Sequence, residues 1–411
     1  MKGFKQFINE ERLLVEGGNA KAINRKTQEV IARPQRMDMS KVSRKEIRKK
    51  LLDLFKDLNI LFGKKYEEPL WPSITVLTSG HAFNGSTEHL FDPEISDAEF
   101  KKYKKVVGDV DLTVPKKQMS KLFDLLADLE KKKLGGGHFV YLGQNKPKLM
   151  GHAINAIFQL QEPKINLQVD FEGVNYEGDS PDAFGKFSHN STWKDVQQGV
   201  KGLAHKILIQ NFARVVSQMN NIVILTPSSV DAQGIIKGNP KVSSSITQEL
   251  PTNLAFSVDR GVREKYAAAK DSKGQDVYID GKQAFYQVKT INSKYSTDLS
   301  GIYQMLFNRK PKDDDDLQKF HSFNGMLSLM KSNRVSQKVI SNIFLSILEK
   351  SFFGKHAAGT ENNNPEGDRN TKMVIVNRIV KEFPYLKPIL EKSQQMIDRY
   401  YDNYKEVKVD S

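Results

Sequence analysis

Two aspartates stand one residue apart in an otherwise apolar run, "VVGDVDLTVP" at residues 106–115. Aspartate is a poor strand former, so a strand that carries two of them points to a functional reason. Successive side chains of a strand lie on opposite faces. Asp109 and Asp111 therefore share one face, whereas Val110 and Leu112 share the other. We predict that the two carboxylates project together from a polar face.

A third carboxylate comes from "INLQVDFEG", residues 165–173. The same alternation places Asp170 and Glu172 on a polar face, opposite a face of apolar side chains. If this strand lies beside the first one, Asp109, Asp111 and Asp170 converge on one face of a sheet.

Convergent carboxylates repel each other, and a pair about 4 Å apart costs about 4 kcal/mol at an effective dielectric constant of about 20. Either one carboxyl group takes up a proton or a cation lies between them. An all-oxygen ligand set favours a hard cation, Mg²⁺ or Mn²⁺. Because Mg²⁺ commonly shares its coordination shell with substrate phosphates, these residues predict metal-dependent phosphoryl chemistry.

A glycine turn precedes the acidic strands in the chain. "SITVLTSGHAF", residues 73–83, is rich in β-branched residues and is predicted to be a strand. Gly85 and Ser86 follow it in "GSTEHLF", where a helix is predicted to begin. Such a turn offers backbone N–H groups to a phosphate, and Ser86 adds a hydroxyl group. We therefore expect Gly85 and Ser86 to bind nucleotide phosphates.

The order Gly85-Ser86, Asp109-x-Asp111 and Asp170 resembles the signature of the DNA-polymerase-β-like nucleotidyltransferase superfamily. The resemblance implies transfer of a nucleoside monophosphate from a nucleoside triphosphate to an acceptor hydroxyl, with release of pyrophosphate. It implies that Asp109 and Asp111 hold the metal ions and that Asp170 helps to bind the catalytic metal and draws the acceptor proton. It also implies that Gly85 and Ser86 cradle the triphosphate.

One feature departs from the family pattern. The gap from Ser86 to Asp109 is 23 residues, whereas about a dozen are usual in the family. We interpret the extra segment, "DPEISDAEFKKYKK" at residues 92–105, as a polar loop insertion.

The surrounding pattern predicts an α+β fold, a small mixed-sheet nucleotidyltransferase core followed by a largely helical C-terminal region with a β-containing insert. A helix is predicted at residues 43–63, with Ser43 and Glu46 as a capping box and Gly63 as its stop. Its apolar stripe consists of Ile47, Leu51, Leu54, Phe55 and Leu58. A second helix is predicted at residues 116–133, and further strands at residues 138–143 and 152–161.

These elements suggest five segments. They are a leader at residues 1–16, a flexible segment at 17–40, the catalytic domain at 41–185, a helix with a β-containing insert at 186–297, and a helical C-terminal domain at 298–411. In the fourth segment, Lys206, Gln210 and Arg214 form a polar line on an apolar helix. This line either binds the triphosphate or an RNA backbone, or is simply solvated.

Composition narrows the possible functions. The chain of 411 residues carries a formal net charge of +14, which favours polyanionic partners, and RNA, including tRNA, is the favoured acceptor. The absence of cysteine excludes disulfides, thiolate metal sites and cysteine nucleophiles. No apolar run approaches the roughly 20 residues of a membrane helix, so we expect no membrane partner.

The N-terminal "MKGFKQFINEERLLVE" is predicted to be an amphipathic helix and lacks the apolar core of a secretory signal. With the following "GG" it resembles the capsid-targeting leader of internal head proteins in large contractile-tailed phages. In that family the prohead protease cuts after a glutamate, which corresponds to Glu16 before Gly17. The resemblance implies a prohead scaffold and prohead protease as partners, and location in the virion head and then the host cytoplasm. The alternative is an ordinary N-terminal helix.

Two alternative functions remain open. The chain is a basic, DNA-associated internal head protein without catalysis, or a nucleotidyltransferase that modifies a protein or a small molecule. In the first case the charge of +14 is the functional feature. In the second case the chemistry is the same and only the acceptor differs.

Overall fold

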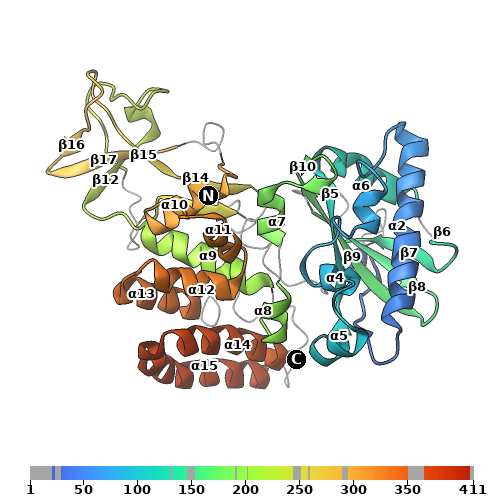
Figure 1. Ribbon diagram of the computed structural model, residues 1–411. Helices are drawn as coiled ribbons and strands as arrows, with labels where there is room; N and C mark the ends of the chain where they lie inside the picture. Colours follow the sequence, from blue (N-terminus) through green and yellow to red (C-terminus); the bar gives the residue numbers. More distant parts are fainter. Residues whose placement is uncertain are drawn as a thin grey trace. The chain divides into compact units, whose positions relative to one another are not determined.

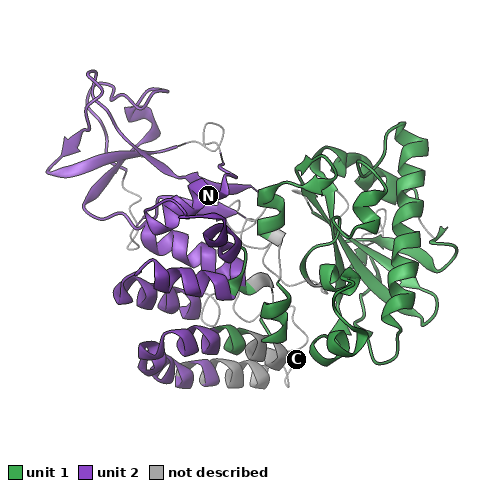
Figure 2. Ribbon diagram, viewed as in Figure 1, with its two compact units in different colours: residues 1–204, 321–323, 358–375 green, residues 205–320, 324–357, 376–411 purple. Residues whose placement is uncertain are grey.

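The computed structural model describes residues 21–23, 29–129, 132–145, 153–189, 192–200, 202–243, 251–257, 260–288, 295–349 and 365–407. The predicted leader at residues 1–16 and its cleavage position, Glu16 and Gly17, lie outside these residues. The chain forms two compact units, coloured separately in Figure 2. The first comprises residues 1–204, 321–323 and 358–375, and the second comprises residues 205–320, 324–357 and 376–411.

A mixed seven-stranded sheet forms the centre of the first unit (Figure 1). Its strands are β1 (Ala22–Ile23), β2 (Val30–Ala32), β5 (Asp109–Pro115), β6 (Lys133–Leu134), β7 (Phe139–Gln144), β8 (Ala153–Leu160) and β9 (Ile165–Val174). They follow the order β2-β1-β7-β8-β9-β5, and β6 pairs with β7. The pair β5–β9 is parallel and the other pairs are antiparallel. Two small ladders join β3 (Met37–Asp38) to β4 (Val106–Val107) and β10 (Tyr176–Glu177) to β11 (Ser180–Pro181).

The apolar face of this sheet is covered by the helix predicted at residues 43–63, which is α2 (Arg44–Tyr66). The Ser43 hydroxyl caps it by accepting a hydrogen bond from the Glu46 N–H at 3.4 Å. All five residues of the predicted stripe are buried and share one core with Val110 and Leu112 of β5. The helix α6 (Met119–Ala127) packs on the same core. The apolar face of β5 is thus buried, and its acidic face lies on the opposite side of the sheet.

Among the described residues, the other helices of the first unit are α3 (Thr75–Thr78), α4 (Gly85–Phe91), α5 (Asp97–Tyr103), the short 3₁₀ helix η2 (Lys116–Gln118), α7 (Ala183–His189) and α8 (Trp193–Gln197). The ring of Trp193 in α8 stacks on Phe100 of α5 at 6.0 Å. Its indole N–H donates a hydrogen bond to Glu99 at 3.0 Å.

Five sequence predictions in this unit are wrong. The described residues of the segment at 17–40, predicted to be flexible, contain β1, β2 and β3, which pair with other strands. The helix predicted at residues 116–133 ends at Ala127, and Lys133 pairs with Val140 in the sheet.

Residues 73–83 are not a strand: they form α3 and a turn, and only Phe83 makes an isolated bridge, to Leu112. The adjacent residues Val76 and Leu77 are both buried, which a helical turn allows and a half-buried strand does not. Here packing overrides the β propensity of the side chains.

The other two errors concern a helix end and the insertion. Gly63 does not end α2, which continues to Tyr66 because Tyr66 packs on Phe62 and donates a hydrogen bond to the carbonyl of Lys121 at 2.9 Å. The segment at residues 92–105 is not merely a loop, since it contains α5. Its formation is explained by a Ser96 cap and by Phe100, which is fully buried.

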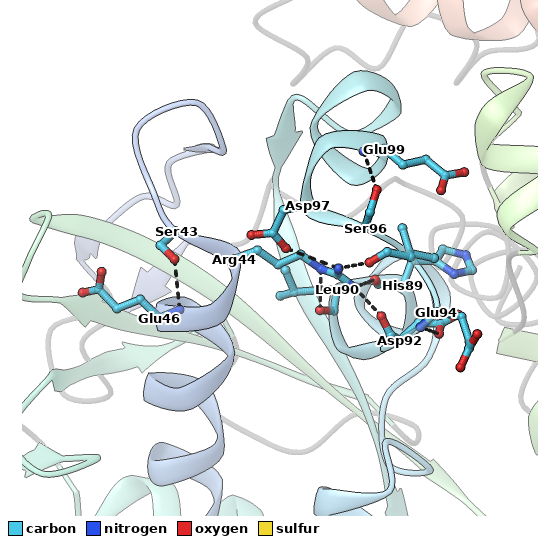
Figure 3. A network of polar contacts seen from close by, with 11 residues as sticks. Ser43, Arg44, Glu46, His89, Leu90, Asp92, Glu94, Ser96, Asp97 and Glu99 are labelled. Carbon is cyan, nitrogen blue, oxygen red and sulfur yellow. Dashed lines mark hydrogen bonds and ion pairs between the residues drawn. The ribbon is translucent and has the colours of Figure 1, made fainter.

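A buried cation joins the insertion to α2 (Figure 3). The Arg44 guanidinium, only 3% exposed, donates to the carbonyls of Leu90 at 3.0 Å, His89 at 2.8 Å and Asp92 at 2.5 Å, and to that of Ile95. It also pairs with Asp97 at 3.5 Å. Carbonyls at a helix C-terminus have no partner within their own helix. Arg44 therefore satisfies the end of α4 and fixes α4 and α5 against α2.

The second unit has a helical part and a β-containing part. Helices are α9 (Gly202–Val216), η3 (Pro227–Ser229), α10 (Leu299–Phe307), α11 (Asp314–Phe320), α12 (Phe323–Ser332), α13 (Gln337–Leu348), α14 (Pro365–Glu382), η5 (Pro384–Leu386) and α15 (Lys387–Val407), of which α9, α12 and α14 include residues of the first unit. The strands are β12 (Ile222–Leu225), β15 (Tyr266–Ala268), β16 (Tyr278–Ile279) and β17 (Lys282–Gln287) in one sheet, and the hairpin of β13 (Leu254–Ser257) and β14 (Gly261–Glu264). The predicted α+β class is confirmed.

Candidate active site

The two acidic strands are direct neighbours. In the parallel pair β5–β9, Asp111 lies opposite Asp170 and Asp109 lies opposite Gln168. Residues opposite each other in a ladder place their side chains on the same face. The structure therefore brings together Asp109, Asp111 and Asp170, the three carboxylates that the sequence singled out.

These carboxylates are close enough to share a cation. One oxygen from each of Asp109, Asp111 and Asp170 can be chosen so that all three lie within 4.8 Å of one another. Asp109 and Asp111 are half-buried, and Asp170 is only 8% exposed. Among the described residues, this is the one group of three acidic or histidine side chains with such a geometry. Carboxylate oxygens are the ligands that Mg²⁺ and Mn²⁺ prefer.

Neutral amides hold the Asp170 carboxylate in place. The Asn155 side chain, which lies opposite it on β8, donates to Oδ1 at 2.8 Å. The Gln168 amide donates to both carboxylate oxygens at 2.9 Å. Amides orient a carboxylate without cancelling its charge, so the group can still act as a ligand for a cation.

Burial raises the pKa of Asp170 to about 8, and the charge of Asp109 adds to this rise. The hydrogen bonds from Asn155 and Gln168 act in the opposite direction, because they favour the ionised form. When no cation is bound, Asp170 therefore holds a proton at neutral pH. A divalent cation bound between the carboxylates would compete with that proton.

A fourth carboxylate lies on the same face. Glu172 follows Asp170 by two residues on β9 and accepts a hydrogen bond from the Asn84 amide at 3.0 Å. Asn84 is 7% exposed, and its Oδ1 has no hydrogen-bond partner among the described residues. A buried acceptor without a donor is costly unless water or a ligand supplies one. This oxygen and the all-oxygen carboxylate set fit a hydrated hard cation.

The glycine turn is bonded directly to the acidic strand. Residues 82–84 run antiparallel to β5: the Thr113 N–H donates to the Ala82 carbonyl at 2.7 Å, and the Asn84 N–H donates to the Asp111 carbonyl at 3.3 Å. The Thr87 hydroxyl accepts a hydrogen bond from the Asp111 N–H at 2.8 Å. The start of α4 is therefore fixed beside Asp111.

Gly85 begins α4 with a φ of 55°. An L-residue with a side chain is strained in this left-handed region, so glycine is required for the turn. Ser86 follows it in the first turn of α4, but its side chain is outside the described part of the structure. The backbone of Gly85-Ser86 thus lies next to the Asp-x-Asp strand.

The other predicted nucleotide-binding residues, Lys206 and Arg214, are half-buried on α9. They belong to the second unit, whereas the carboxylates belong to the first. Their assignment to the triphosphate therefore rests on the sequence pattern alone.

Several residues that support the site were not predicted from the sequence, among them Asn155 and Arg44. Asn155 is a polar residue in the apolar strand "AINAIFQL", and this interruption was the signal of a special role. That it bonds to Asp170 could not be predicted, because the pairing depends on the register of β8 and β9. Arg44 gave no signal, because its position in a basic helix is indistinguishable from that of a solvated arginine.

Comparison of the chain with protein-family models, with curated proteins and with solved structures gave no match. No helix in the described ranges is both long enough and apolar enough to cross a bilayer.

Proposed function

We propose that this protein is a metal-dependent nucleotidyltransferase. It transfers a nucleoside monophosphate from a nucleoside triphosphate to a hydroxyl group of an acceptor. The observation that supports this proposal is the convergence of Asp109, Asp111 and Asp170 within 4.8 Å, beside the turn at Gly85-Ser86. RNA is the favoured acceptor because the chain carries a net charge of +14.

In the proposed reaction the acceptor oxygen attacks the α-phosphorus of the nucleoside triphosphate. A new phosphorus–oxygen bond forms there, and the bond from the α-phosphorus to the oxygen that bridges to the β-phosphate breaks. Pyrophosphate leaves with that oxygen. The proton of the acceptor hydroxyl passes to the Asp170 carboxylate, which is the acidic group of the site with the raised pKa.

The other residues act by position. Asp109 and Asp111 hold Mg²⁺ or Mn²⁺, and Asn155 and Gln168 keep the Asp170 oxygens oriented. The bound cation supplies charge neutralisation of the triphosphate and activation of the attacking hydroxyl. Backbone N–H groups of the Gly85-Ser86 turn bind phosphate oxygens, a role that rests on the family resemblance.

The direct test is incorporation of label from each α-labelled nucleoside triphosphate into total host RNA, with Mg²⁺ present. The parent protein is compared with Asp109→Asn/Asp111→Asn and with the control Asp124→Asn/Asp128→Asn, two exposed carboxylates at α6. Transfer by the parent and the control, but not by the site variant, is expected. Binding of Mn²⁺, measured by calorimetry, should be lost in the same variant.

Absence of transfer with any nucleotide, with Mn²⁺ and with host protein extract as acceptor, would favour the non-catalytic DNA-associated head protein. Transfer to protein or to a small molecule, and not to RNA, would keep the reaction and change the acceptor.

The N-terminal resemblance adds a proposal about delivery: the chain is packaged in a phage head, processed by the prohead protease and released into the host with the genome. Mass spectrometry of the protein from virions tests it. A mature chain that begins at Gly17 is expected, and an uncut chain, or absence from virions, would contradict this part of the proposal.

A further inference from the structure

A cluster of exposed cations lies near the start of β5. It consists of Arg33, Arg36, Lys102 and Lys105, which are all exposed and which we call the basic rim. Two short segments supply it, residues 33–41 and 100–108. The second of these contains four lysines and no acidic residue.

Backbone pairing places the first segment in line with β5. The Gln35 N–H donates to the Asn166 carbonyl of β9 at 2.7 Å, and the Asn166 amide donates to the Arg33 carbonyl at 3.2 Å. Only two residues further along β9, Gln168 pairs with Asp109 at the start of β5. Arg33 and Arg36 thus lie beside β9 just before the acidic strand joins it.

The second segment leads directly into the acidic strand. The Met39 N–H donates to the Lys105 carbonyl at 2.9 Å, and Met37 pairs with Val107 of β4. Lys105 precedes Asp109 by four residues, which span at most about 14 Å of extended chain. Lys102 lies one turn earlier, in α5, whose first turn is held by the Arg44 network in Figure 3.

The acidic residues in and just before these segments have partners of their own. Asp38 accepts hydrogen bonds from the Ser40 N–H and hydroxyl and pairs with Lys41 at 3.7 Å. Asp97 pairs with Arg44, and Glu99 accepts hydrogen bonds from Trp193 and Gln197. The basic rim thus presents four exposed cations beside a site that is negative.

This combination of charges favours one kind of acceptor. A phosphodiester strand that approaches Asp109, Asp111 and Asp170 is repelled by them, and cations along its path offset that repulsion. A nucleoside triphosphate alone needs only the bound metal and the nearby turn, so cations on separate segments outside that site serve a longer polyanion. Exposed arginine and lysine bind phosphates without reading sequence.

We propose that the basic rim binds the backbone of a single-stranded nucleic acid whose terminal hydroxyl group reaches the three carboxylates. The proposal rests on the nucleotidyltransferase function proposed above, because it identifies the acceptor of that reaction. RNA and DNA share the phosphodiester chemistry, and the test compares them.

The test measures binding of a labelled single-stranded RNA of about twenty nucleotides, and of DNA of the same sequence, by fluorescence anisotropy without nucleotide. The rim variant replaces Arg33, Arg36, Lys102 and Lys105 by alanine. The control variant replaces four other exposed lysines of the first unit by alanine, Lys64, Lys117, Lys132 and Lys133. Lys64 lies near the C-terminal end of α2, a helix of 23 residues and thus about 34 Å long, whereas Arg44 and α5 lie at its start. Both variants remove the same charge.

Four phosphate contacts to a single strand contribute a slope of about −3 to the logarithm of affinity against the logarithm of salt concentration. The rim variant should lack this part of the salt dependence. Between about 50 and 200 mM salt, its affinity should therefore fall about 50-fold less than the affinity of the parent does. The control variant should change the slope by less than about one unit. Equal losses in both variants, or no loss in either, would overturn the proposal.

The two proposals fail in different ways. If the rim variant loses nucleic-acid binding but the parent protein transfers no nucleotide, the basic rim is still a binding surface and the proposed nucleotidyltransferase activity is refuted. If the rim variant transfers nucleotide to RNA at the parent's rate at physiological salt, the proposed role of the basic rim is refuted and the proposed nucleotidyltransferase activity stands. Stronger retention of RNA than of DNA would identify RNA as the acceptor, and the reverse would identify DNA.

Discussion

The cation-free protein should lose stability as the pH rises, because the Asp170 carboxyl group takes up a proton when the chain folds. Burial and the charge of Asp109 raise its pKa to about 8, whereas its ordinary value is 3.8. Between these two values the folded state binds one more proton at this position than the unfolded state does. The contribution of Asp170 to the free energy of unfolding is therefore fully present below pH 3.8 and falls as the pH rises towards 8.

The magnitude follows from the width of this window. Each pH unit within it lowers the free energy of unfolding by about 1.4 kcal/mol for one proton. The whole window amounts to about 6 kcal/mol, which is an upper limit because side chains relax and water enters as the charge forms. Asp170→Asn removes the charge and keeps the size of the side chain. It should therefore be more stable than the parent at about pH 8, by several kcal/mol, and similar at about pH 4.

Tryptophan fluorescence provides a suitable assay. The chain has two tryptophans, Trp71 and Trp193, and both belong to the first unit, so their emission reports the unfolding of that unit. Urea unfolding of parent and variant is measured with a chelator present, from about pH 5 to about pH 8. The difference between the two proteins isolates Asp170 from other groups, such as His321, whose pKa is lowered by burial.

A difference in stability that does not change with pH would refute the reasoning, since it would mean that Asp170 is ionised in the folded protein throughout. Addition of Mn²⁺ should flatten the pH dependence of the parent, because the cation replaces the proton. The Asp124→Asn variant, which alters an exposed carboxylate on α6, should behave like the parent in every condition.

Contacts around the site lead to three more expectations. Asn155→Ala removes a donor to the Asp170 carboxylate, so the pKa of Asp170 should rise further. If this reasoning were wrong, the midpoint of the pH-dependent loss of stability would be unchanged in the same pH series. Arg44→Met leaves several buried carbonyls without their donor and should lower the free energy of unfolding by about 3–5 kcal/mol, with little recovery in Arg44→Lys; a loss below about 1 kcal/mol in urea unfolding would contradict the role of Arg44. Gly85→Ala places a side chain at a φ of 55°, which costs about 1–2 kcal/mol. It should lower nucleotide transfer while calorimetry shows unchanged Mn²⁺ affinity, and transfer at the parent's rate would count against the turn.

The acidic strands were predictable because strand periodicity is a local property. Asp109 and Asp111 alternate with Val110 and Leu112 in the sequence, and the structure buries the second pair and leaves the first on the opposite face. The same rule placed Asp170 on a polar face. The sequence did not show whether the two strands are neighbours. In the structure β5 pairs with β9, in a register that places Asp111 opposite Asp170.

Local signals failed where distant contacts decide the conformation. The β-branched residues of 73–83 favoured a strand, but Val76 and Leu77 are both buried in α3. Gly63 read as a helix stop, yet Tyr66 gains a partner in Lys121 that extends α2. In each case the stabilising group lies elsewhere in the chain, where a local pattern cannot reveal it.

The sequence by itself determined the candidate ligands, their faces and the hard cation that they favour, because these follow from residue type and from the period of a strand. Only the tertiary structure decided which groups surround them. Arg44 is a buried structural cation and Lys105 an exposed one, although both belong to basic stretches, because burial depends on what packs against each residue. The raised pKa of Asp170 likewise follows from the exclusion of water by the fold and, secondly, from the carboxylate of Asp109 on a neighbouring strand.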